Sequence, residues 1–500
     1  MTASDPQLRI ANLERELHWA DLKIQSLLEE MRPLRIKFLG PKSETLSSLQ
    51  LELLAEEEPS ATRDEGEAEA RCEPLTRSAA RERKPHPGRK PLPDKLPRVE
   101  AVMACATCTC ASCGEPTAVI GYDESEQLDV EPAHYFVRVT KREKRACPRG
   151  ENATVIAAPL AERIVEKGLA SDAVVINAVV AKYCDHLPLY RQAVMLEREA
   201  GVEIGRATLE GWVMRVGELL APVIAAMRRN LLTASYLQAD ETTVPVQMHD
   251  QRGENHQAYL WQYGKPGGET VFEFCLGRGR EGPRKFLGQW EGVLQTDGYA
   301  AYDDVGGPKL VQVGCWAHAR RKFVDAVKLN PQDAEAVAMV TRMDALFLID
   351  RDARQRELSA DERLAQRRQY AEEWRTAIHE TSLRLARETL PKNALGQAVT
   401  YTLNQWPKLR RCFDYAEVEL SNNLAENSMR PIALGRKNWL HVGSPQSGPK
   451  VAAILSVVES CRRWGVPVKE YLAAVLPGLN QRTLSELPNL TPARWSASRG

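Results

Sequence analysis

Two apolar segments, far apart in the chain, end in the same four-residue phrase, Leu-Gln-x-Asp. The first, "YLQADETTVPV", carries Asp240, and the second, "VLQTDGYAAY", carries Asp297. Side chains two apart in a strand share a face, so Gln238 points with Asp240 and Gln295 with Asp297. If the two strands are neighbours, both carboxylates leave the sheet at the same end. The plainer interpretation is that each aspartate only caps a turn.

A pair of carboxylates at one end of a sheet is a candidate metal site. Two like charges are costly to place together unless a cation neutralises them. Oxygen ligands of this kind suit Mg²⁺ or Mn²⁺. Two such ions, about 3.5–4 Å apart, support in-line phosphoryl chemistry, and holding them requires a third carboxylate.

We select Glu426, in "SNNLAENSMRP", as that third carboxylate. Ser421 or Asn422 can cap a helix here, which puts Asn422, Glu426 and Arg430 on one helical face. Pro431 is expected to end or kink this helix. The sequence therefore offers two strand ends and one helix as the sources of a carboxylate triad.

The period of the apolar residues changes near residue 235. Before this point, residues 160–232 have a helix-turn-helix form, with Gly201 in the turn and Arg206 opening the second helix. Such a rhythm is typical of a DNA-binding unit, and equally of an ordinary helical hairpin. After it, a period of two predicts three strands, a helix and further strands, which indicates a mixed α/β sheet. Residues 325–418 are charged and helical, and we expect them to be a helical insertion in the sheet domain.

The N-terminal segment, residues 1–54, has a coiled-coil pattern. Its apolar residues from Leu13 to Phe38 alternate spacings of four and three. This predicts self-association into a homo-oligomer, or else one amphipathic helix packed on the body of the protein. Residues 55–98 form a charged, Pro-rich linker that cannot bury a core. Its basic half could touch DNA, although a solvated tether is the simpler interpretation.

Eleven cysteines are present, and five of them lie between residues 105 and 147. An odd, clustered set fits reduced thiols with a local metal site better than a disulfide framework. Cys110 and Cys113 form a Cys-x-x-Cys knuckle, and Cys147 follows, so residues 99–159 resemble a zinc ribbon. Strand-like alternation in "HYFVRVTKREKRA" suits the hairpin of such a ribbon. Gly150 stands where the fourth thiolate is expected, so an upstream cysteine completes a Zn²⁺ site or the segment has lost its metal.

Length and composition set the broad class. A chain of 500 residues is expected to contain three or four folding units. No apolar run is long enough to span a bilayer, and the N-terminus lacks a signal-peptide pattern, so we expect a cytoplasmic protein without a membrane partner. The net charge is zero, from 67 basic and 67 acidic residues, so the total charge alone predicts no polyanionic partner.

Four blocks of the sequence carry a family resemblance: "LQADETTVPV", "LQTDGYAAY", "GCWAHARRKF" and "NNLAENSMRPIALGRKNW". They resemble the signature blocks of bacterial insertion-sequence transposases of the IS sixty-six type. The resemblance extends over nearly the whole chain, including a C-terminal helical element at residues 451–500. It implies a multidomain α/β protein with a ribonuclease-H-like core at residues 233–450, interrupted by the helical insertion.

The resemblance also implies a function. Asp240, Asp297 and Glu426 would be the metal-binding triad of an Asp-Asp-Glu transposase. One ion activates water to cut the element's end, and the freed 3′-hydroxyl attacks target DNA by transesterification. The expected partners are DNA and two small proteins of the same element, and the expected location is the nucleoid. A Mg²⁺-dependent, structure-specific nuclease and a catalytically inactive DNA-binding regulator are the alternatives.

Basic residues near the triad, together with Arg206 of the helix-turn-helix-like region, are candidates for DNA contact, and solvated surface charge is the alternative for each. Cys315 and His318 resemble a Cys-x-x-His pair of such transposases, for which we prefer active-site positioning or core packing over metal binding. The candidate DNA contacts are Arg206, Arg320, Arg321, Lys322, Arg430, Arg436 and Lys437.

Overall fold

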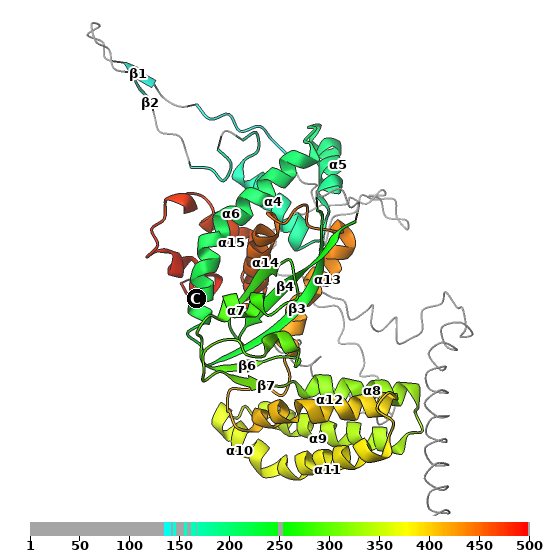
Figure 1. The fold of residues 1–500 in the computed structure, drawn as a ribbon. Coiled ribbons are helices and arrows are strands. Elements are labelled where there is room, and N and C mark those ends of the chain that lie inside the picture. The colour runs from blue at the N-terminus through cyan, green and yellow to red at the C-terminus, as the bar shows by residue number, and fades with distance from the viewer. Residues whose placement is uncertain are drawn as a thin grey trace, which may run out of the picture.

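The computed structural model describes residues 135–141, 144–146, 155–157, 162–166, 168–248 and 254–498 (Figure 1). The expected coiled coil and linker lie outside the described residues, as do Cys110, Cys113 and Cys147. Within the zinc-ribbon-like segment, β1 (Lys144–Ala146) pairs antiparallel with β2 (Val155–Ala157). Residues 135–141 form no strand, so the hairpin strand is shorter than the sequence predicted.

A five-stranded mixed sheet forms the centre of the protein, which confirms the α/β prediction. Its strands are β3 (Tyr236–Val246), β4 (His256–Gly264), β5 (Thr270–Cys275), β6 (Val293–Gln295) and β7 (Val311–Val313). Their spatial order is β5-β4-β3-β6-β7. The first three strands pair antiparallel, and β6 and β7 continue parallel to β3, which makes β3 the central strand.

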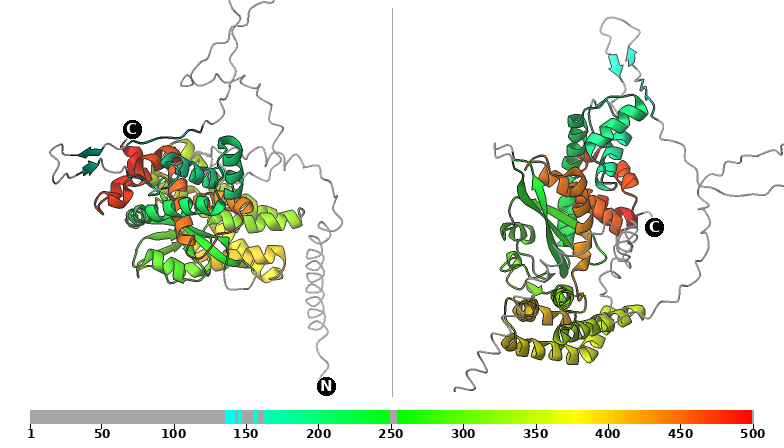
Figure 2. Two further views of the ribbon diagram at one scale, coloured as in Figure 1. Left: turned by 90° about the horizontal axis from the view of Figure 1, so that it is seen from above. Right: turned by 90° about the vertical axis from the view of Figure 1, so that its right-hand side faces the viewer.

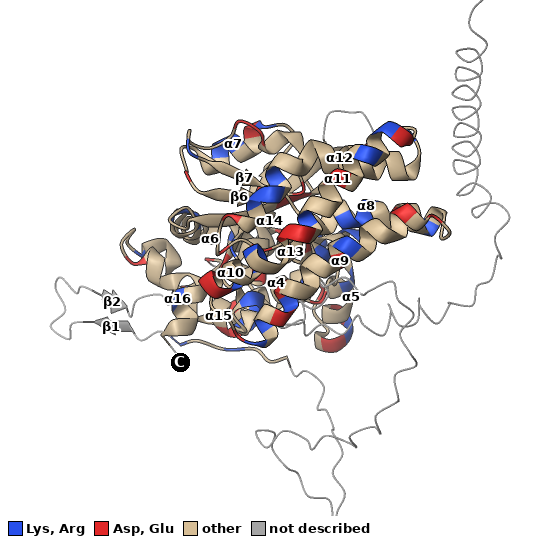
Figure 3. Ribbon diagram, turned by 90° about the horizontal axis from the view of Figure 1, so that it is seen from below, with Lys and Arg blue, Asp and Glu red and all other residues tan. Residues whose placement is uncertain are grey.

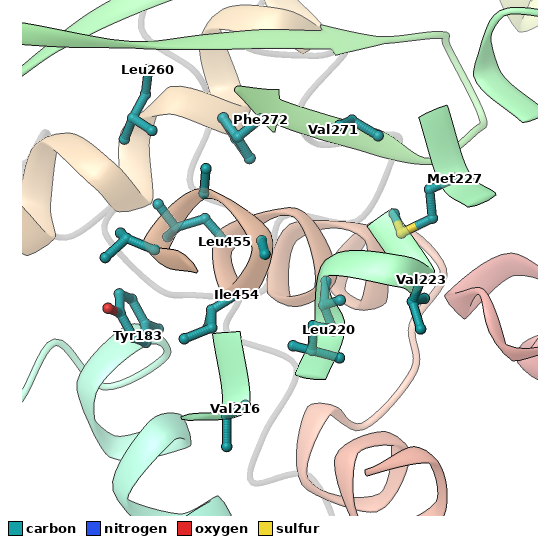
Figure 4. Close-up of a cluster of buried hydrophobic side chains, with 14 of the residues drawn as sticks. Tyr183, Val216, Leu220, Val223, Met227, Leu260, Val271, Phe272, Ile454 and Leu455 are labelled. Carbon is teal, nitrogen blue, oxygen red and sulfur yellow. The ribbon is translucent and has the colours of Figure 1, made fainter. Parts of the chain in front are cut away.

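Helices before and after the sheet share one hydrophobic core with it. These helices are α4 (Asp172–Tyr183), α5 (Leu189–Ala200), α6 (Arg206–Leu231), α13 (Asn423–Trp439), α14 (Gly448–Arg463) and α15 (Val468–Val475). Figure 4 shows Val216, Leu220 and Met227 of α6 facing Ile454 and Leu455 of α14. The expected core domain at residues 233–450 therefore shares its hydrophobic core with the helical regions on either side of it.

The helix-turn-helix form that the sequence predicted is present in the structure. Helix α5 ends at Ala200, Gly201 has the left-handed φ of 65° that suits glycine, and α6 begins at Arg206. Helix α6 is longer than a simple recognition helix because apolar residues recur along its 26 residues every three or four positions. That apolar face is buried against α14 and β5.

The helical insertion forms a second hydrophobic cluster beside the sheet. Its helices are α8 (Trp316–Leu329), α9 (Ala334–Gln355), α10 (Ala360–Tyr370), α11 (Glu372–Glu388), α12 (Ala394–Leu409) and the 3₁₀ helix η2 (Arg410–Phe413). The helices start at Trp316, before the expected residue 325. A hydrogen bond of 2.9 Å from Trp316 N to Leu420 O joins the points where the chain leaves and re-enters the sheet region.

Helix α13 carries Glu426 and packs on β3, and Figure 2 (right) shows it beside the sheet in orange. Of the two outcomes expected at Pro431, an end or a kink, the end is wrong, because α13 continues to Trp439. The remaining short elements are α7 (Glu281–Leu287), η1 (Ala300–Tyr302), η3 (Leu479–Gln481), η4 (Leu487–Leu490) and α16 (Pro492–Ala497). Among the described helices, none has the length and apolar character needed to cross a membrane.

Candidate active site

The two Leu-Gln-x-Asp phrases lie side by side on neighbouring parallel strands. Leu237 of β3 is in register with Leu294 of β6, and Gln238 is in register with Gln295. Asp240 and Asp297 each follow two residues after the glutamine of their own segment. The repeated phrase thus aligns the two carboxylates, but only one strand ends there: β6 ends at Gln295, just before Asp297, whereas β3 continues past Asp240 to Val246 because it also pairs with β4.

The paired glutamines are buried and hold the segment that leads into α13. Gln238 Nε2 donates to Gln295 Oε1 at 3.1 Å and to the carbonyl of Ser421 at 2.9 Å. Gln295 Nε2 donates to the carbonyl of Glu419 at 2.8 Å. Tyr236, whose hydroxyl donates to Gln295 Oε1 at 2.5 Å, also accepts a hydrogen bond from Glu419 N. This network, the glutamine clamp, returns the chain from the helical insertion to the sheet directly before Glu426.

The three carboxylates are half-buried, and the charges of the other two act on Asp240. Burial raises the pKa of Asp240 well above its ordinary value, and the charges of Glu241, Glu426 and Asp297 raise it further. Such a shift means that an ionised Asp240 destabilises the fold when no cation is near. The helix that carries Glu426 therefore comes within electrostatic range of Asp240 on β3.

Glu426 has two basic neighbours on α8. Arg321 Nη2 donates to Glu426 Oε2 at 3.0 Å, and His318 Nε2 lies 3.2 Å from Glu426 Oε1. Burial lowers the pKa of His318, which favours its neutral form. Cys315 is buried, and its Sγ accepts a hydrogen bond from Asn422 N. This arrangement fits the positioning role that the sequence suggested for Cys315 and His318.

Helix α12 of the insertion holds the turn after Asp297. Tyr401 donates its hydroxyl proton to the carbonyl of Asp297 at 2.5 Å, and Gln405 donates to the carbonyl of Gly298 at 3.4 Å. Gly298 has a φ of +94°, and a Cβ there would lie 2.5 Å from the Gln405 side chain. Asp297 Oδ1 accepts a hydrogen bond from Tyr299 N at 2.8 Å. A glycine is therefore required at this turn by its backbone and by its neighbour.

The carboxylates of Asp240, Asp297 and Glu426 are oxygen donors that suit a hard divalent cation, but in this structure they do not all point at one position. Among the residues that the structure describes, no three or more His, Cys, Asp or Glu side chains stand close enough to form a ready ligand set. Glu426 Oε1 is buried and accepts no hydrogen bond from the described residues. Together with the raised pKa of Asp240, this leaves buried anionic oxygens that a cation would compensate.

Sequence reasoning missed a second carboxylate network beside Asp240. Glu241 Oε1 accepts hydrogen bonds from Arg278 at 2.8 and 3.1 Å, and its Oε2 accepts one from Tyr302 at 2.9 Å. The Arg278 guanidinium lies 3.9 Å from the ring centre of Tyr299. These contacts pair the Glu241 carboxylate with the Arg278 guanidinium. The basic "GRGR" loop that contains Arg278 was the available signal.

The candidate DNA contacts fall into two groups. Arg206, Arg321, Lys322, Arg430 and Lys437 are exposed at the surface.

Two further candidates are engaged inside the protein. Arg320 is buried and paired with Asp344, with Nε to Oδ1 at 2.5 Å, so contrary to expectation its side chain is not presented to DNA. Arg436 Nη1 donates to Thr242 Oγ1 and to the carbonyl of Thr243, which fastens α13 to β3. Figure 3 shows basic and acidic segments interspersed along the helices.

Comparison with known proteins finds matches to three segments of the chain. A family model described as "Transposase IS66 family" matches residues 167–450. Two others match upstream: "Transposase C of IS166 homeodomain" at residues 26–101 and "zinc-finger binding domain of transposase IS66" at residues 107–149. Similar chains from Sinorhizobium fredii include "Uncharacterized protein y4jD", 32% identical over 425 residues that cover 82% of each chain. "Uncharacterized protein y4hP" is 30% identical over 503 residues, which cover 95% of this chain and 88% of the relative.

Proposed function

The chain belongs to the IS66 family of transposases, and on that premise we propose that it cleaves the ends of an insertion sequence and joins them to target DNA. Asp240, Asp297 and Glu426 form the catalytic triad of this proposal. The observation that carries it is the register of Gln238 with Gln295, which aligns the two aspartates, with the segment before Glu426 bound to the same two glutamines. The strand order and directions support a ribonuclease-H-like core.

The three carboxylates would hold Mg²⁺ or Mn²⁺. When bound, such an ion stabilises negative charge on the oxygens that enter and leave the phosphorus, first in end cleavage by water and then in attack by the 3′-hydroxyl on target DNA. The chain's own residues hold the carboxylates in place. The glutamine clamp fixes the approach of Glu426, and Tyr401 and Gln405 fix the turn after Asp297.

Exposed cations around the triad are suited to the DNA backbone. Arg321 and Lys322 lie on α8 beside Glu426, and Arg430 lies one turn further along α13. Their positive charge attracts phosphates without sequence preference. Arg206, at the start of α6, serves a more distant part of the DNA in this proposal.

The N-terminal segments complete the proposal. Residues 1–54 would self-associate as a coiled coil, and Cys110, Cys113 and Cys147 would bind Zn²⁺ with a fourth ligand still to be identified. Elemental analysis of the purified protein tests the zinc assignment. We also propose association with small proteins of the same element and with the nucleoid, and membership of the family is the support for this.

A strand-transfer assay with Mg²⁺ and oligonucleotides that carry the element's end tests the function. Joined products are expected from the wild type and are expected to be lost in Asp240→Asn, Asp297→Asn and Glu426→Gln. The matched control is Asp304→Asn, since Asp304 is an exposed carboxylate paired with Arg280 at 3.4 Å. Joining that survives the triad substitutions would remove the triad assignment. Cleavage without joining would favour a nuclease, and specific binding without either reaction would favour a regulator.

A further inference from the structure

A cavity of about 160 Å³ lies between the helix-turn-helix-like helices and the end of α13. The end of α4, the starts of α5 and α6, and the segment after α13 form its walls. A dry cavity of roughly 150 Å³ accepts one benzene ring, so this volume suits a single aromatic ring. Glu426 and Trp439 lie on the same helix, about 20 Å apart at 1.5 Å per residue, so the cavity is separate from the triad.

Aromatic side chains and a cation line the cavity. Trp439 and the half-exposed Tyr190 contribute aromatic rings. A Cβ at Gly435 would lie 2.5 Å from Trp439 Nε1, so the glycine allows the indole to lie back along its own helix. Lys182 Nζ lies 5.6 Å from the ring centre of Tyr183 and 5.8 Å from that of Trp439. Burial lowers the pKa of Lys182 to about 8, which leaves the amine mostly charged at neutral pH.

Tyr183, one of the residues that line the cavity, has a buried hydroxyl group without a partner among the described residues. Tyr183 is 2% exposed, and its hydroxyl has no hydrogen-bond partner among the described residues. Figure 4 shows this hydroxyl pointing away from Ile454 and the other labelled core side chains. Burial raises the pKa of Tyr183, so the group remains a donor. Buried polar groups normally have partners, so this unsatisfied donor on a residue of the cavity wall can serve an acceptor group of a ligand.

We propose that this cavity binds one unpaired base of DNA, turned out of the duplex. The inference rests on the proposed function, in which DNA is the partner. The ring of a base stacks on aromatic side chains such as Trp439. Tyr183 donates to a ring nitrogen or carbonyl oxygen, and Glu210, also in the wall, accepts from an exocyclic amino group. Arg206, exposed at the rim, meets the phosphate beside the turned-out base.

The test uses the full chain and three fluorescent duplexes built on the element-end sequence. One duplex is fully paired, one has a single unpaired cytosine, and one has an abasic residue at the same position. The abasic duplex bends like the cytosine duplex but offers no base. Fluorescence anisotropy is expected to give about tenfold tighter binding of the cytosine duplex than of the abasic duplex by the wild type.

Two substitutions separate base binding from folding. In Trp439→Ala the preference is expected to fall to about one. In Tyr183→Phe it is expected to fall several-fold while the Tm does not decrease, because the lost hydroxyl has no partner among the described residues. Trp464→Ala is the matched control, since Trp464 is 40% exposed and lies outside the cavity, and it is expected to keep the preference.

Equal wild-type affinity for the cytosine and abasic duplexes would overturn the proposal. Retention of the preference in both Trp439→Ala and Tyr183→Phe would also overturn it. Asp240→Asn distinguishes this failure from failure of the proposed function, because it should abolish joining while keeping the cytosine preference. Binding of free cytidine without any preference among the duplexes would assign the cavity to a small molecule instead.

Discussion

Gln238 and Gln295 stand in register on β3 and β6, with Nε2 of the first donating to Oε1 of the second at 3.1 Å, both side chains buried. Each also donates to a backbone carbonyl of residues 419–421, far along the chain. Two strands and the entry to α13 are thus joined at one point.

Gln295→Leu is expected to lower the free energy of unfolding by about 3 kcal/mol, because it leaves the carbonyls of Gly314 and Glu419 and the Tyr236 hydroxyl without this partner. Urea denaturation measures the loss, and strand joining should fall further than the folded fraction. Gln257→Leu, at an exposed position of β4, is the control and should change little. Equal losses in both variants would mean that the clamp contributes nothing specific.

Gly298→Ala is expected to destabilise the protein by about 2 kcal/mol or more. The φ of +94° is unfavourable for alanine, and the new Cβ would meet Gln405 at 2.5 Å. Adding Gln405→Ala to Gly298→Ala should restore only the part of the lost stability that comes from the steric clash. Gly211→Ala is the control, because Gly211 lies within α6 with nothing within 4 Å of its added Cβ, and there alanine should stabilise by up to about 1 kcal/mol. Thermal unfolding of the wild type and of these three variants measures the changes.

A buried ion pair in the helical insertion predicts acid sensitivity. Burial tends to raise the pKa of Asp350, but Arg367, Arg354 and Arg363 outweigh it and hold this pKa below the ordinary 3.8. The resulting stabilisation is therefore complete above about pH 4 and is lost as the pH falls through the lower folded-state pKa. Asp350→Asn should cost about 3 kcal/mol at pH 7, since it weakens the pairing of the buried Arg367, and should flatten the loss of stability towards pH 3.

Urea titrations at several pH values measure this effect. Asp325→Asn serves as control because Asp325 forms an exposed pair with Lys328 at 3.5 Å. The control should keep the wild-type pH slope. A wild-type slope in Asp350→Asn would contradict the assignment.

On the proposed function, Mn²⁺ is expected to raise the Tm of the wild type by mass action. Asp240→Asn should be at least as stable as the wild type without the ion, because burial and neighbouring charges oppose ionised Asp240. It should also lose most of the Mn²⁺-dependent increase. Differential scanning calorimetry with and without the ion measures both effects, and Asp304→Asn should respond like the wild type. An equal Mn²⁺ response in Asp240→Asn would remove Asp240 from the ligand set.

Sequence reasoning reached the elements of the site through local patterns. The period of two and the repeated phrase predicted strands with Gln238 beside Asp240, and the helical spacing predicted the helix of Glu426. The contacts of both glutamines with residues 419–421 could not be predicted, because they depend on how the insertion returns to the sheet. Charge alone likewise could not distinguish buried Arg320 from exposed Arg321, since the difference is set by Asp344 on another helix.

Two further differences from the sequence-based expectation have similar causes. Pro431 is a helix breaker by propensity, yet packing of α13 on β3 maintains the helix to Trp439. The α5–α6 hairpin was predicted, but its inclusion in the core of the sheet depends on α14, more than two hundred residues later along the sequence.

The hydrogen bond between Trp316 and Leu420 has a consequence for how the family can diversify. It makes the insertion a loop whose two ends are already together, and the entropy of closing such a loop grows only with the logarithm of its length. Gain or loss of whole helical turns far from the sheet is therefore thermodynamically inexpensive. Changes at Tyr401, Gln405 or Glu419 are different, because they alter the contacts through which the loop holds the carboxylates. Insertions and deletions can therefore change the length of this segment as long as these few contacts are kept.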